Sequence, residues 1–174
     1  MFNPVRPDLH GQGLHHRFRP YEPGIRLPLI VRNPLSKARG TQSDSLVSWV
    51  DLAPTILEFA GAPRDKQLQG SSFLAEVDGR GEKGADEVYA SHTFHEVTMY
   101  YPMRVVRTRQ HKLIWNMAHG LEYPSASDLW HSATWQAALA KGPSSSYGKR
   151  TVAQYLDRPE WELYDLEADP DETK

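Results

Sequence analysis

Cysteine is absent from this chain of 174 residues. Disulfide bonds and thiolate zinc sites are therefore excluded, and no thiol can act as a nucleophile. Long apolar runs are absent as well, because no segment reaches the roughly 18 consecutive apolar residues that suggest a membrane span. The N-terminus lacks the charged and then apolar pattern of an export signal, but a longer parent protein could carry one. The sequence therefore leaves the compartment open, with an exported parent as one outcome.

A strong charge of either sign is also missing. The formal net charge is -2, from 20 basic and 22 acidic residues. Nucleic acid usually selects a basic protein face, so the composition gives no support to a nucleic-acid partner. In contrast, 13 prolines and 12 glycines predict many turns and irregular connections.

The apolar run from Leu27 to Val31 is the most informative local pattern. It follows the turn-forming residues 22–24 (Glu-Pro-Gly), and we predict a fully buried strand that extends to Arg32. Pro28 is compatible with the first positions of such a strand. Only about 20 residues precede the turn, too few to build a sheet that covers this strand on both faces. We therefore expect the chain to be the tail of a larger protein.

A helix is predicted over residues 51–61. Asp51 is placed to cap the free N–H groups, and Pro54 lies in the first turn, where no intrahelical N–H bond is needed. Gly61 is a natural end. The apolar residues recur at helical spacing and fall on one face of this helix: Leu52, Ile56, Phe59 and Ala60.

In the second half of the chain the pattern changes to that of short strands. Segments rich in Val, Ile, Tyr and Trp predict strands at residues 87–91, 103–108, 112–116 and 161–166, with a hairpin turn at 109–111. Residues 132–141 suit a helix with Trp135 and Leu139 on one face. We therefore expect the end of a large α/β domain at 1–62, a polar linker at 63–86, and an α+β subdomain with a small antiparallel sheet at 87–174.

Eight histidines first suggest a metal site. His15 and His16 are adjacent, so they cannot both face one ion from a regular helix or strand. His92 and His95 are three residues apart, but the residues between them favour extended chain. No metal-binding motif stands out, so surface or hydrogen-bonded histidines are the simpler interpretation.

Two groups of polar residues could bind an anionic sugar. Arg17, Arg19 and Arg26 surround the turn before the apolar run, and arginine suits tetrahedral oxyanions because its planar fork binds two oxygens at once. Residues 92–104 combine imidazole, carboxylate, hydroxyl, aromatic and guanidinium groups. That mixture suits sugar recognition, but solvated arginines and an ordinary loop at a sheet edge would show the same residues.

Taken together, these stretches resemble the C-terminal part of sulfatases. Residues 21–31 are similar to the segment that follows the metal site in that family, and residues 50–61 match its Asp-x-x-Pro-Thr-x-Leu…Ala-Gly pattern. Further stretches resemble the heparan N-sulfatases (sulfamidases, or N-sulfoglucosamine sulfohydrolases): residues 95–104, 112–116, 132–136 and 161–173. The resemblance covers nearly everything from residue 17 to 174.

The resemblance implies an alkaline-phosphatase-like α/β fold, incomplete here, and hydrolysis of sulfate esters or N-sulfate groups of glycans. Members of the family use a formylglycine made from Cys or Ser in a C/S-x-P-S-R motif, together with a calcium ion held by acidic residues. This chain has no cysteine and no S-x-P-S-R. We therefore expect no turnover from this chain alone.

The same resemblance implies the candidate site residues. Arg17 is the candidate catalytic residue, a sulfate contact, because it stands four residues before Tyr21, where the family has lysine or arginine. Asp8 is a candidate calcium ligand, although an extra residue interrupts the family's Asp-Asn/His-Gly motif at this point. The implied partner is a sulfated saccharide, and the candidate substrate-binding residues are His95, Glu96 and Arg104.

Two alternatives remain open. Phosphodiesterases and phosphatases share the superfamily core, and the nucleophile, which this chain lacks, would decide between them and a sulfatase. A non-catalytic glycan-binding module would unfold cooperatively on its own and would bind sulfated oligosaccharide without metal. Exposed apolar faces on the predicted strand and helix argue against that independent stability.

Overall fold

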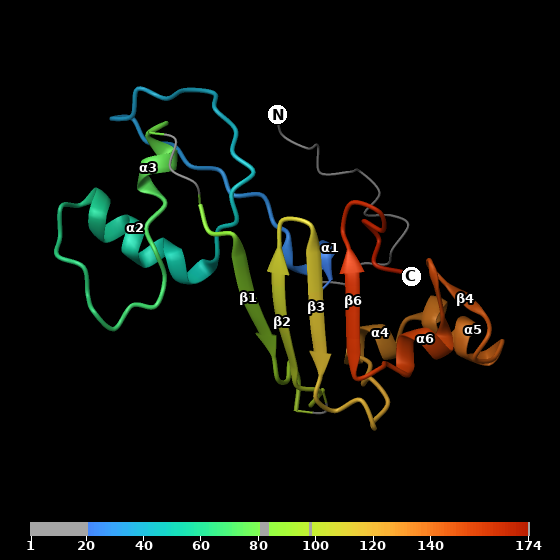
Figure 1. The fold of residues 1–174 in the computed structure, drawn as a ribbon. Coiled ribbons are helices and arrows are strands. Elements are labelled where there is room, and N and C mark those ends of the chain that lie inside the picture. The colour runs from blue at the N-terminus through green and yellow to red at the C-terminus, as the bar shows by residue number, and fades with distance from the viewer. Residues whose placement is uncertain (1–20, 81–83, 98, 174) are drawn as a thin grey trace. The chain divides into compact units, whose positions relative to one another are not determined.

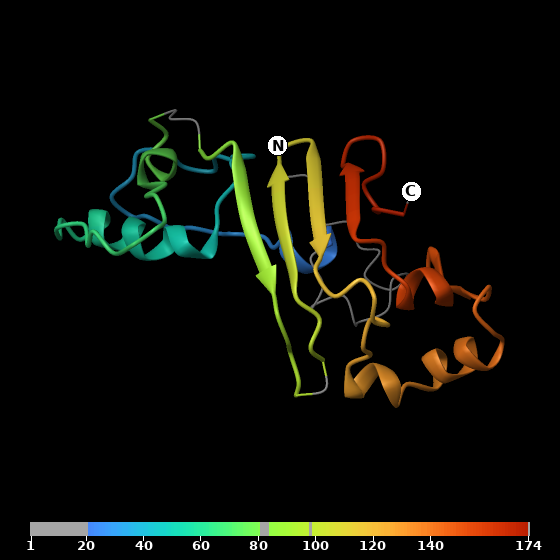
Figure 2. The same ribbon diagram turned by 60° about the horizontal axis from the view of Figure 1, so that its bottom comes forward.

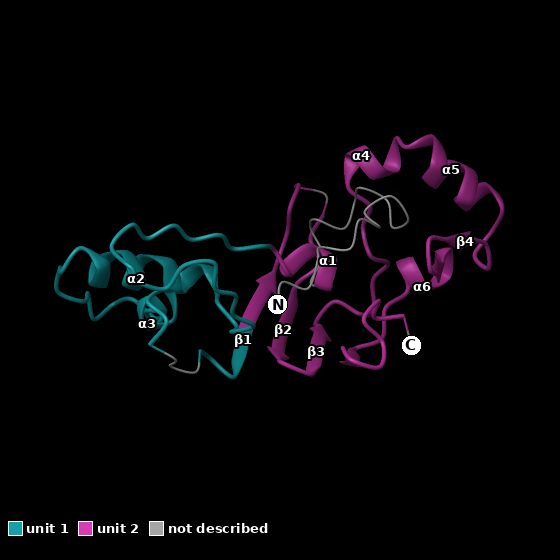
Figure 3. Cartoon of the chain, turned by 90° about the horizontal axis from the view of Figure 1, so that it is seen from above, with its two compact units in different colours: residues 1–4, 28–88 teal, residues 5–27, 89–174 magenta. Residues whose placement is uncertain are grey.

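The computed structural model describes residues 21–80, 84–97 and 99–173. The chain divides into two compact units (Figure 3). Unit 1 here means the described residues of 28–88, and unit 2 means residues 21–27 together with the described residues of 89–174. No helix among the described residues is both long enough and apolar enough to cross a lipid bilayer.

A four-stranded sheet is the centre of unit 2 (Figure 1). Its order is β1-β2-β3-β6, and the pairs β2–β3 and β3–β6 are antiparallel. The strands are β1 (Glu87–His92, whose first two residues fall in unit 1), β2 (Met103–Thr108), β3 (His111–Asn116) and β6 (Trp161–Asp165). The structure confirms the four predicted strands and the hairpin, and with them the mixed α/β class with a small antiparallel sheet.

Alternating burial along the strands gives the sheet one covered face. On this inner face, Val105 and Ile114 pack with Tyr164 and with Tyr21 from the start of the chain's described part. The opposite face exposes apolar side chains, because Leu163 is 67% exposed and Trp161 50% exposed. Trp161 lies beside Trp115 in the β3–β6 register, with their rings stacked at 5.3 Å.

The helices of unit 2 are short. Helices α4, α5 and α6 gather beside the β6 edge of the sheet (Figures 1 and 2). The predicted helix at 132–141 is confirmed as α5, whose N-cap Ser132 accepts a hydrogen bond from the Trp135 amide. The other elements are α1 (Glu22–Ile25), α4 (Ser127–Trp130), β4 (Ser146–Tyr147), β5 (Arg150–Thr151) and α6 (Val152–Leu156); α5 itself runs Ala133–Ala140.

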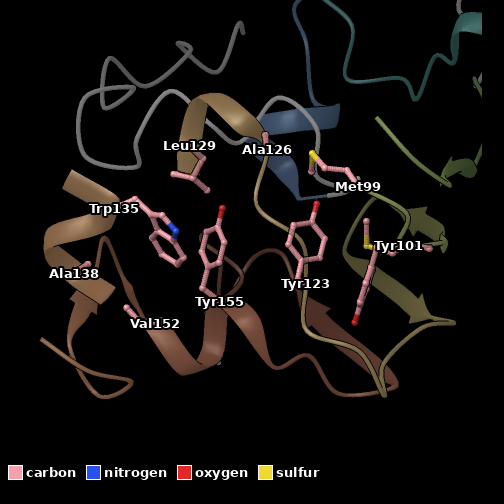
Figure 4. Close-up of a cluster of buried hydrophobic side chains, with 10 residues drawn as sticks. Met99, Tyr101, Tyr123, Ala126, Leu129, Trp135, Ala138, Val152 and Tyr155 are labelled. Carbon is pink, nitrogen blue, oxygen red and sulfur yellow. The ribbon is translucent and has the colours of Figure 1, made fainter. Parts of the chain in front are cut away.

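Aromatic side chains build the larger apolar core of unit 2 (Figure 4). Trp135 and Tyr101 are fully buried. The Trp135 ring lies 4.6 Å from that of Tyr155, and the Tyr101 ring lies 5.0 Å from that of Tyr123. Contacts between aromatic rings at this range add to the stabilisation from buried area, so this core holds α4, α5 and α6 to the loop that precedes β2.

Unit 1 contains η3 (Trp49–Asp51), α2 (Leu52–Phe59) and α3 (Leu74–Val77). The predicted helix at 51–61 is therefore present as α2, but Asp51 does not cap it: the carboxylate accepts from the Ser48 and Ser71 amides. The apolar face of this helix is largely uncovered, since Ile56 and Phe59 are 65% and 50% exposed.

The predicted strand from Leu27 to Arg32 does not form. These residues are extended without regular structure, and Leu27 and Ile30 are 59% and 84% exposed. A strand needs hydrogen bonds from a neighbouring strand, and no strand among the described residues pairs with this one. The proposed linker at 63–86 includes α3, and the boundaries 1–62, 63–86 and 87–174 stay a prediction.

Candidate functional site

The loop between β1 and β2 carries most of the predicted substrate-binding residues. Its two arms are joined by a hydrogen bond from the Tyr101 amide to the Thr93 carbonyl at 2.9 Å. The His92 ring supports the same closure, since Nδ1 lies 3.1 Å from the Tyr101 carbonyl oxygen. Tyr101 is buried in the aromatic core, so the base of the loop is fixed while His95 at its tip is exposed.

Glu96 turns its carboxylate back onto unit 2. The two carboxylate oxygens accept hydrogen bonds from the amide of Ser127, at 3.2 Å, and from its hydroxyl, at 2.9 Å. The Glu96 carbonyl accepts from the Met99 amide at 2.8 Å. In this structure Glu96 thus joins the loop to the beginning of α4, which is a structural task.

Arg104 points outward from β2 and is exposed. Its Nη1 donates to the Met103 carbonyl at 2.9 Å and makes a longer contact of 3.4 Å to the His92 carbonyl. A guanidinium has five N–H donors, so these bonds to carbonyl groups are compatible with binding an anion as well. Arg104 and His95 are therefore the two predicted residues that present their side chains to solvent.

A second set of functional groups lies on the inner face of the sheet, around Tyr21. The Tyr21 hydroxyl donates to Glu162 Oε2 at 2.7 Å and accepts from Arg158 Nη1. The guanidinium carbons of Arg150 and Arg158 lie 4.1 Å and 5.1 Å from the centre of the Tyr21 ring. Tyr21 is thus held at its edge by hydrogen bonds and at its ring by cation–π contacts.

Glu162 is the acceptor on which these bonds converge. Its Oε2 also accepts from the Tyr164 hydroxyl, and its Oε1 accepts from Asn116 Nδ2 at 2.7 Å. Burial alone would raise the pKa of Glu162, but the charge of Arg158 and the hydrogen bonds keep that pKa below its usual value. Glu162 is therefore a charged group held inside the protein by its partners.

Next to Tyr21 lies a buried ionic cluster, which we call the Glu22 cluster: Glu22, Arg107, Lys112 and Glu172. Arg107 donates to both carboxylate oxygens of Glu22, from Nε at 2.7 Å and from Nη2 at 2.9 Å. Lys112, which is fully buried, bridges Glu22 Oε1 at 2.8 Å and Glu172 Oε1 at 2.7 Å. The Glu22 amide donates to Glu172 Oε2 at 2.6 Å.

The formal charges of the Glu22 cluster cancel. Burial raises the pKa of Glu22, but the hydrogen bonds and charges of Arg107 and Lys112 outweigh that effect and lower this pKa to about 2. Glu22 is therefore ionised throughout the neutral range. Removing one member of such a buried group leaves an uncompensated charge in a poorly solvated place.

Sequence reasoning missed both buried polar groups. A usable signal was present: in the alternating strands β2 and β3, Arg107 and Lys112 occupy inner-face positions among apolar residues, and an inward charge requires a partner. The partners themselves could not be found this way, because Glu22 is 85 residues from Arg107 along the chain. Of the remaining predicted site residues, Arg17 and Asp8 lie outside the described part of the chain.

The described residues do not provide a calcium site. No group of three or more His, Asp or Glu side chains among residues 21–80, 84–97 and 99–173 is arranged to hold a metal ion. Calcium prefers six to eight oxygen ligands, and the buried carboxylates Glu22, Glu162 and Glu172 already bind cationic or hydroxyl groups. A calcium ligand at Asp8 stays a prediction.

Comparison with known proteins agrees with the resemblance read from the sequence. The family model "N-sulphoglucosamine sulphohydrolase, C-terminal" matches residues 11–129. The chain is 36% identical over 166 residues to human N-sulphoglucosamine sulphohydrolase, an alignment that covers 88% of this chain and 33% of the human protein. It is 31% identical to an N-acetylglucosamine-6-O-sulfatase of Bacteroides thetaiotaomicron, over 87% of this chain and 21% of that protein.

Among solved structures, one similar chain is a protein in complex with its substrate D-glucosamine-2-N,6-O-disulfate. The superposition has a TM-score of 0.42 and 25% identity, over 71% of this chain and 18% of the other. This chain spans about a third or less of the length of these relatives. From the family match and the sequence identities, the chain belongs to the N-sulphoglucosamine sulphohydrolase family and corresponds to a C-terminal part of its sulfatases.

Proposed function

We propose that this chain is the C-terminal part of a sulfatase that removes sulfate from amino-sugar glycans. The family match over residues 11–129 carries the proposal. It is supported by the names of two relatives, an N-sulphoglucosamine sulphohydrolase and an N-acetylglucosamine-6-O-sulfatase. These names suggest the proposed substrate, a glucosamine that bears an N-sulfate or an O-sulfate.

The residues of this chain would contribute binding and orientation. Arg17 would contact the sulfate, and the exposed side chains of His95 and Arg104 would donate hydrogen bonds to the anionic sugar. Glu96 has a different part in this proposal, since its carboxylate already holds the loop to Ser127. It would keep the loop in position, while the loop forms one wall of the substrate site.

The nucleophile is what the chain does not supply. It has no cysteine and no S-x-P-S-R motif, so a formylglycine cannot be made from it. Calcium, where bound in the complete enzyme, would polarise the sulfate. Electrostatic stabilisation of a transition state by a single arginine cannot replace both groups. The chain alone is therefore expected to bind sulfated sugar weakly and to release no sulfate.

The exposed apolar side chains of unit 1 fit the same proposal. Ile30, Trp49 and Ile56 are 84%, 79% and 65% exposed. Exposed apolar surface that forms a patch usually marks an interaction site. The rest of the sulfatase is the proposed occupant of that surface, since this chain covers only 33% of the length of the human relative.

Two measurements test the proposal. The first is sulfate release from N-sulfoglucosamine and from N-acetylglucosamine-6-sulfate by the isolated chain, with and without calcium, beside the variant Arg17→Ala. No release above the variant is expected; release that depends on Arg17 would show that the chain is an enzyme by itself.

The second measurement is calorimetric binding of an N-sulfated heparin tetrasaccharide at low salt. Arg17→Ala and Arg104→Ala should each weaken binding, and added salt should weaken it further. Tight binding without metal, unaffected by Arg17→Ala, would favour the non-catalytic glycan-binding module. Preference for a phosphorylated over a sulfated sugar would favour the phosphodiesterase or phosphatase alternative.

A further inference from the structure

Three residues on neighbouring strands lie side by side on the outer face of the sheet, the face opposite to the one that packs against Tyr21. They are Arg104 in β2, Trp115 in β3 and Trp161 in β6, three strands that follow one another in Figure 1. The register places Arg104 opposite Trp115 and Trp115 opposite Trp161. Each has a buried neighbour in its own strand, and successive side chains of a strand point to opposite faces. We call these three residues the outer row.

The two tryptophans of the outer row are incompletely buried. Trp115 is 36% exposed and Trp161 is 50% exposed, and their rings stack with centres 5.3 Å apart and planes inclined by only 7°. Leu163, the next residue of β6 on this face, is 67% exposed. An aromatic side chain contributes most when its area is buried, and adjoining exposed apolar residues commonly mark a binding surface. The outer row therefore has the character of a binding surface.

The stacking determines which ring surfaces a ligand can reach. Trp161 covers one face of the Trp115 ring, so the opposite face of Trp115 is the one left for a ligand. The face of an aromatic ring carries negative electrostatic potential, which attracts the C–H groups of a sugar ring because neighbouring oxygens make their hydrogens slightly positive. An aromatic face beside a cation therefore suits a sugar that carries an anionic group.

Arg104 supplies the positive charge of the outer row. Its Nη1 donates to the Met103 carbonyl at 2.9 Å and approaches the carbonyl of His92, the last residue of β1, at 3.4 Å, so the guanidinium is held on the side of β1. No ion pair joins Arg104 to a carboxylate of the described chain. The stack with Trp161 holds the Trp115 ring on the side of β6. The two side chains thus lean apart, and the surface above β2 and β3 lies between them.

Charge favours a sulfated sugar over a covering protein layer as the occupant of this surface. A protein layer that packed on the outer row would bury Arg104, and a buried charge is costly unless the layer also supplies a carboxylate. A sulfated sugar brings its own anion, which matches the planar fork of an arginine. Neighbouring strands are about 5 Å apart, so one sugar ring is of a size to lie against Trp115 with its sulfate at Arg104.

We propose that the outer row is a binding site for a sulfated sugar residue, in which the sugar ring stacks on Trp115 and a sulfate group binds Arg104. Trp161 is a positioning residue that holds the Trp115 ring by stacking. This inference rests on the proposed function, which supplies the class of ligand, and it adds an aromatic contact that selects for the sugar ring itself. The outer row binds the glycan and takes no part in cleavage of the sulfate.

Calorimetric titration of the 174-residue chain with an N-sulfated heparin tetrasaccharide at low salt tests the inference. Trp115→Ala should weaken binding about two- to tenfold, a change equivalent to the loss of one aromatic contact. The matched control is Trp130→Ala, because Trp130 is a 52% exposed tryptophan of α4 in the same unit and lies outside the outer row; its substitution should leave the affinity unchanged. Equal affinities of the Trp115→Ala and Trp130→Ala variants would overturn the inference.

The same tetrasaccharide without its sulfate groups separates this inference from the proposed function. The unaltered chain should bind the desulfated sugar more weakly, and Arg104→Ala, which weakens binding of the sulfated sugar, should then have no further effect. Binding that needs sulfate but is indifferent to Trp115→Ala would leave the proposed function standing and refute the outer row. Equal binding of the two sugars would contradict the proposed substrate class and, with it, the part of Arg104. Absence of binding would overturn both proposals.

The positioning part of Trp161 is tested by rescue. Trp161→Phe retains a ring against Trp115 and should keep most of the affinity, whereas Trp161→Ala should lower it as far as Trp115→Ala does; equal losses from the two Trp161 variants would contradict this part. A measurement on the unaltered chain guards against unfolded variants. The indole N–H resonance of Trp115 should shift during the titration while that of the fully buried Trp135 stays in place. An unchanged Trp115 resonance would refute the site whatever the variants show.

A second copy of the chain is the other occupant that these variants can detect. Sedimentation equilibrium is measured for the unaltered chain and for Trp115→Ala at the concentrations used in the titration. Self-association that Trp115→Ala abolishes, together with unchanged sugar binding, would make the outer row an interface between copies and overturn the inference. Monomers in both cases, with the expected loss of affinity, would support it.

Discussion

The two units treat their large apolar side chains in opposite ways. Unit 2 encloses Trp135 and Tyr101 completely, whereas unit 1 leaves Trp49 and Ile56 mostly in solvent. Both units have residues of apolar character at regular spacing, so the difference does not come from local pattern. It comes from whether a second layer is present to cover the pattern. Periodicity shows which residues can be buried, and only the tertiary partners decide whether they are.

Charged residues show the same contrast. In unit 2, Arg107 and Lys112 lie inside the protein with carboxylate partners within 3 Å. In unit 1, Arg80 and Asp78 form a looser pair at 3.7 Å with both side chains in contact with water. Exposed pairs contribute little to stability, and breaking buried ones is severe. Unit 2 is therefore the part of the chain in which single substitutions should have large effects.

The largest effect is expected when substitutions of two tryptophans are compared. Trp135→Ala should lower the free energy of unfolding by about 3–5 kcal/mol, because it empties a fully enclosed site. Trp49→Ala, with a side chain that is 79% exposed, should change it by less than about 0.5 kcal/mol. Urea denaturation followed by far-ultraviolet circular dichroism measures both. Similar losses from the two variants would contradict the division into a covered and an uncovered unit.

The second prediction compares two lysines within unit 2. Lys112→Met leaves Glu22 and Glu172 facing each other without their shared cation, and should cost about 3–5 kcal/mol. The matched control is Lys149→Met, which breaks an exposed pair with Asp171 and should cost no more than about 1 kcal/mol. The same urea titration at pH 7 compares them. A small loss for Lys112→Met would mean that water reaches the Glu22 cluster.

The third prediction concerns acid. The pKa of Glu22 falls from an unfolded value of 4.5 to about 2 in the folded chain, so its contribution to stability is complete above pH 4.5 and disappears as the pH falls toward 2. A pKa shift of this size corresponds to a loss on the order of 3 kcal/mol in the free energy of unfolding. Glu22 faces Arg107, Lys112, Glu172 and, at 4.0 Å, Arg26.

The variant Glu22→Gln isolates the contribution of Glu22 ionisation to stability. The pKa of Glu172 is raised by burial, so Glu172 titrates with the opposite sign: its ionisation removes stability as the pH rises above 4.5. Because the charge of Glu22 contributes to that raised pKa, the comparison is made between Glu172→Gln and the double variant that also carries Glu22→Gln, in which Glu172 no longer titrates. Urea midpoints measured from pH 7 to pH 2.5 should converge as the medium becomes acidic. Parallel curves across that range would show that Glu22 has no depressed pKa.

The sheet could be predicted from the sequence because its signal is local. Alternation and β-branched or aromatic residues placed all four strands within a residue or two of β1, β2, β3 and β6. The run from Leu27 to Arg32 has an equally good strand composition, yet it forms no strand. Its composition shows only that these residues are suited to a buried strand. The hydrogen bonds that define a strand must come from a neighbouring strand.

The candidate site shows the same difference between local features, which the sequence predicts, and long-range contacts, which it does not. Residue type and spacing were enough to single out residues 92–104, which include His95, Glu96 and Arg104, but not to tell that the Glu96 carboxylate is bound to Ser127, 31 residues away. The polar contacts of Tyr21 were beyond sequence reasoning for the same reason, since its hydroxyl is bound to Glu162 across 141 residues. Contacts of that range follow from the packing of the sheet and not from any local pattern.

The smallest expected effect is one that the two units should share. Ser132→Ala removes the acceptor for the Trp135 amide at the start of α5, and Asp51→Ala removes the acceptor for the Ser48 and Ser71 amides beside α2. Each loss should be about 1 kcal/mol, because each side chain accepts directly from backbone amides and needs no covering layer to do so. Hydrogen exchange of the Trp135 amide and of the Ser48 and Ser71 amides measures the two losses separately. A loss confined to unit 2 would mean that these bonds, too, need the covering layer that unit 1 does not have among its described residues.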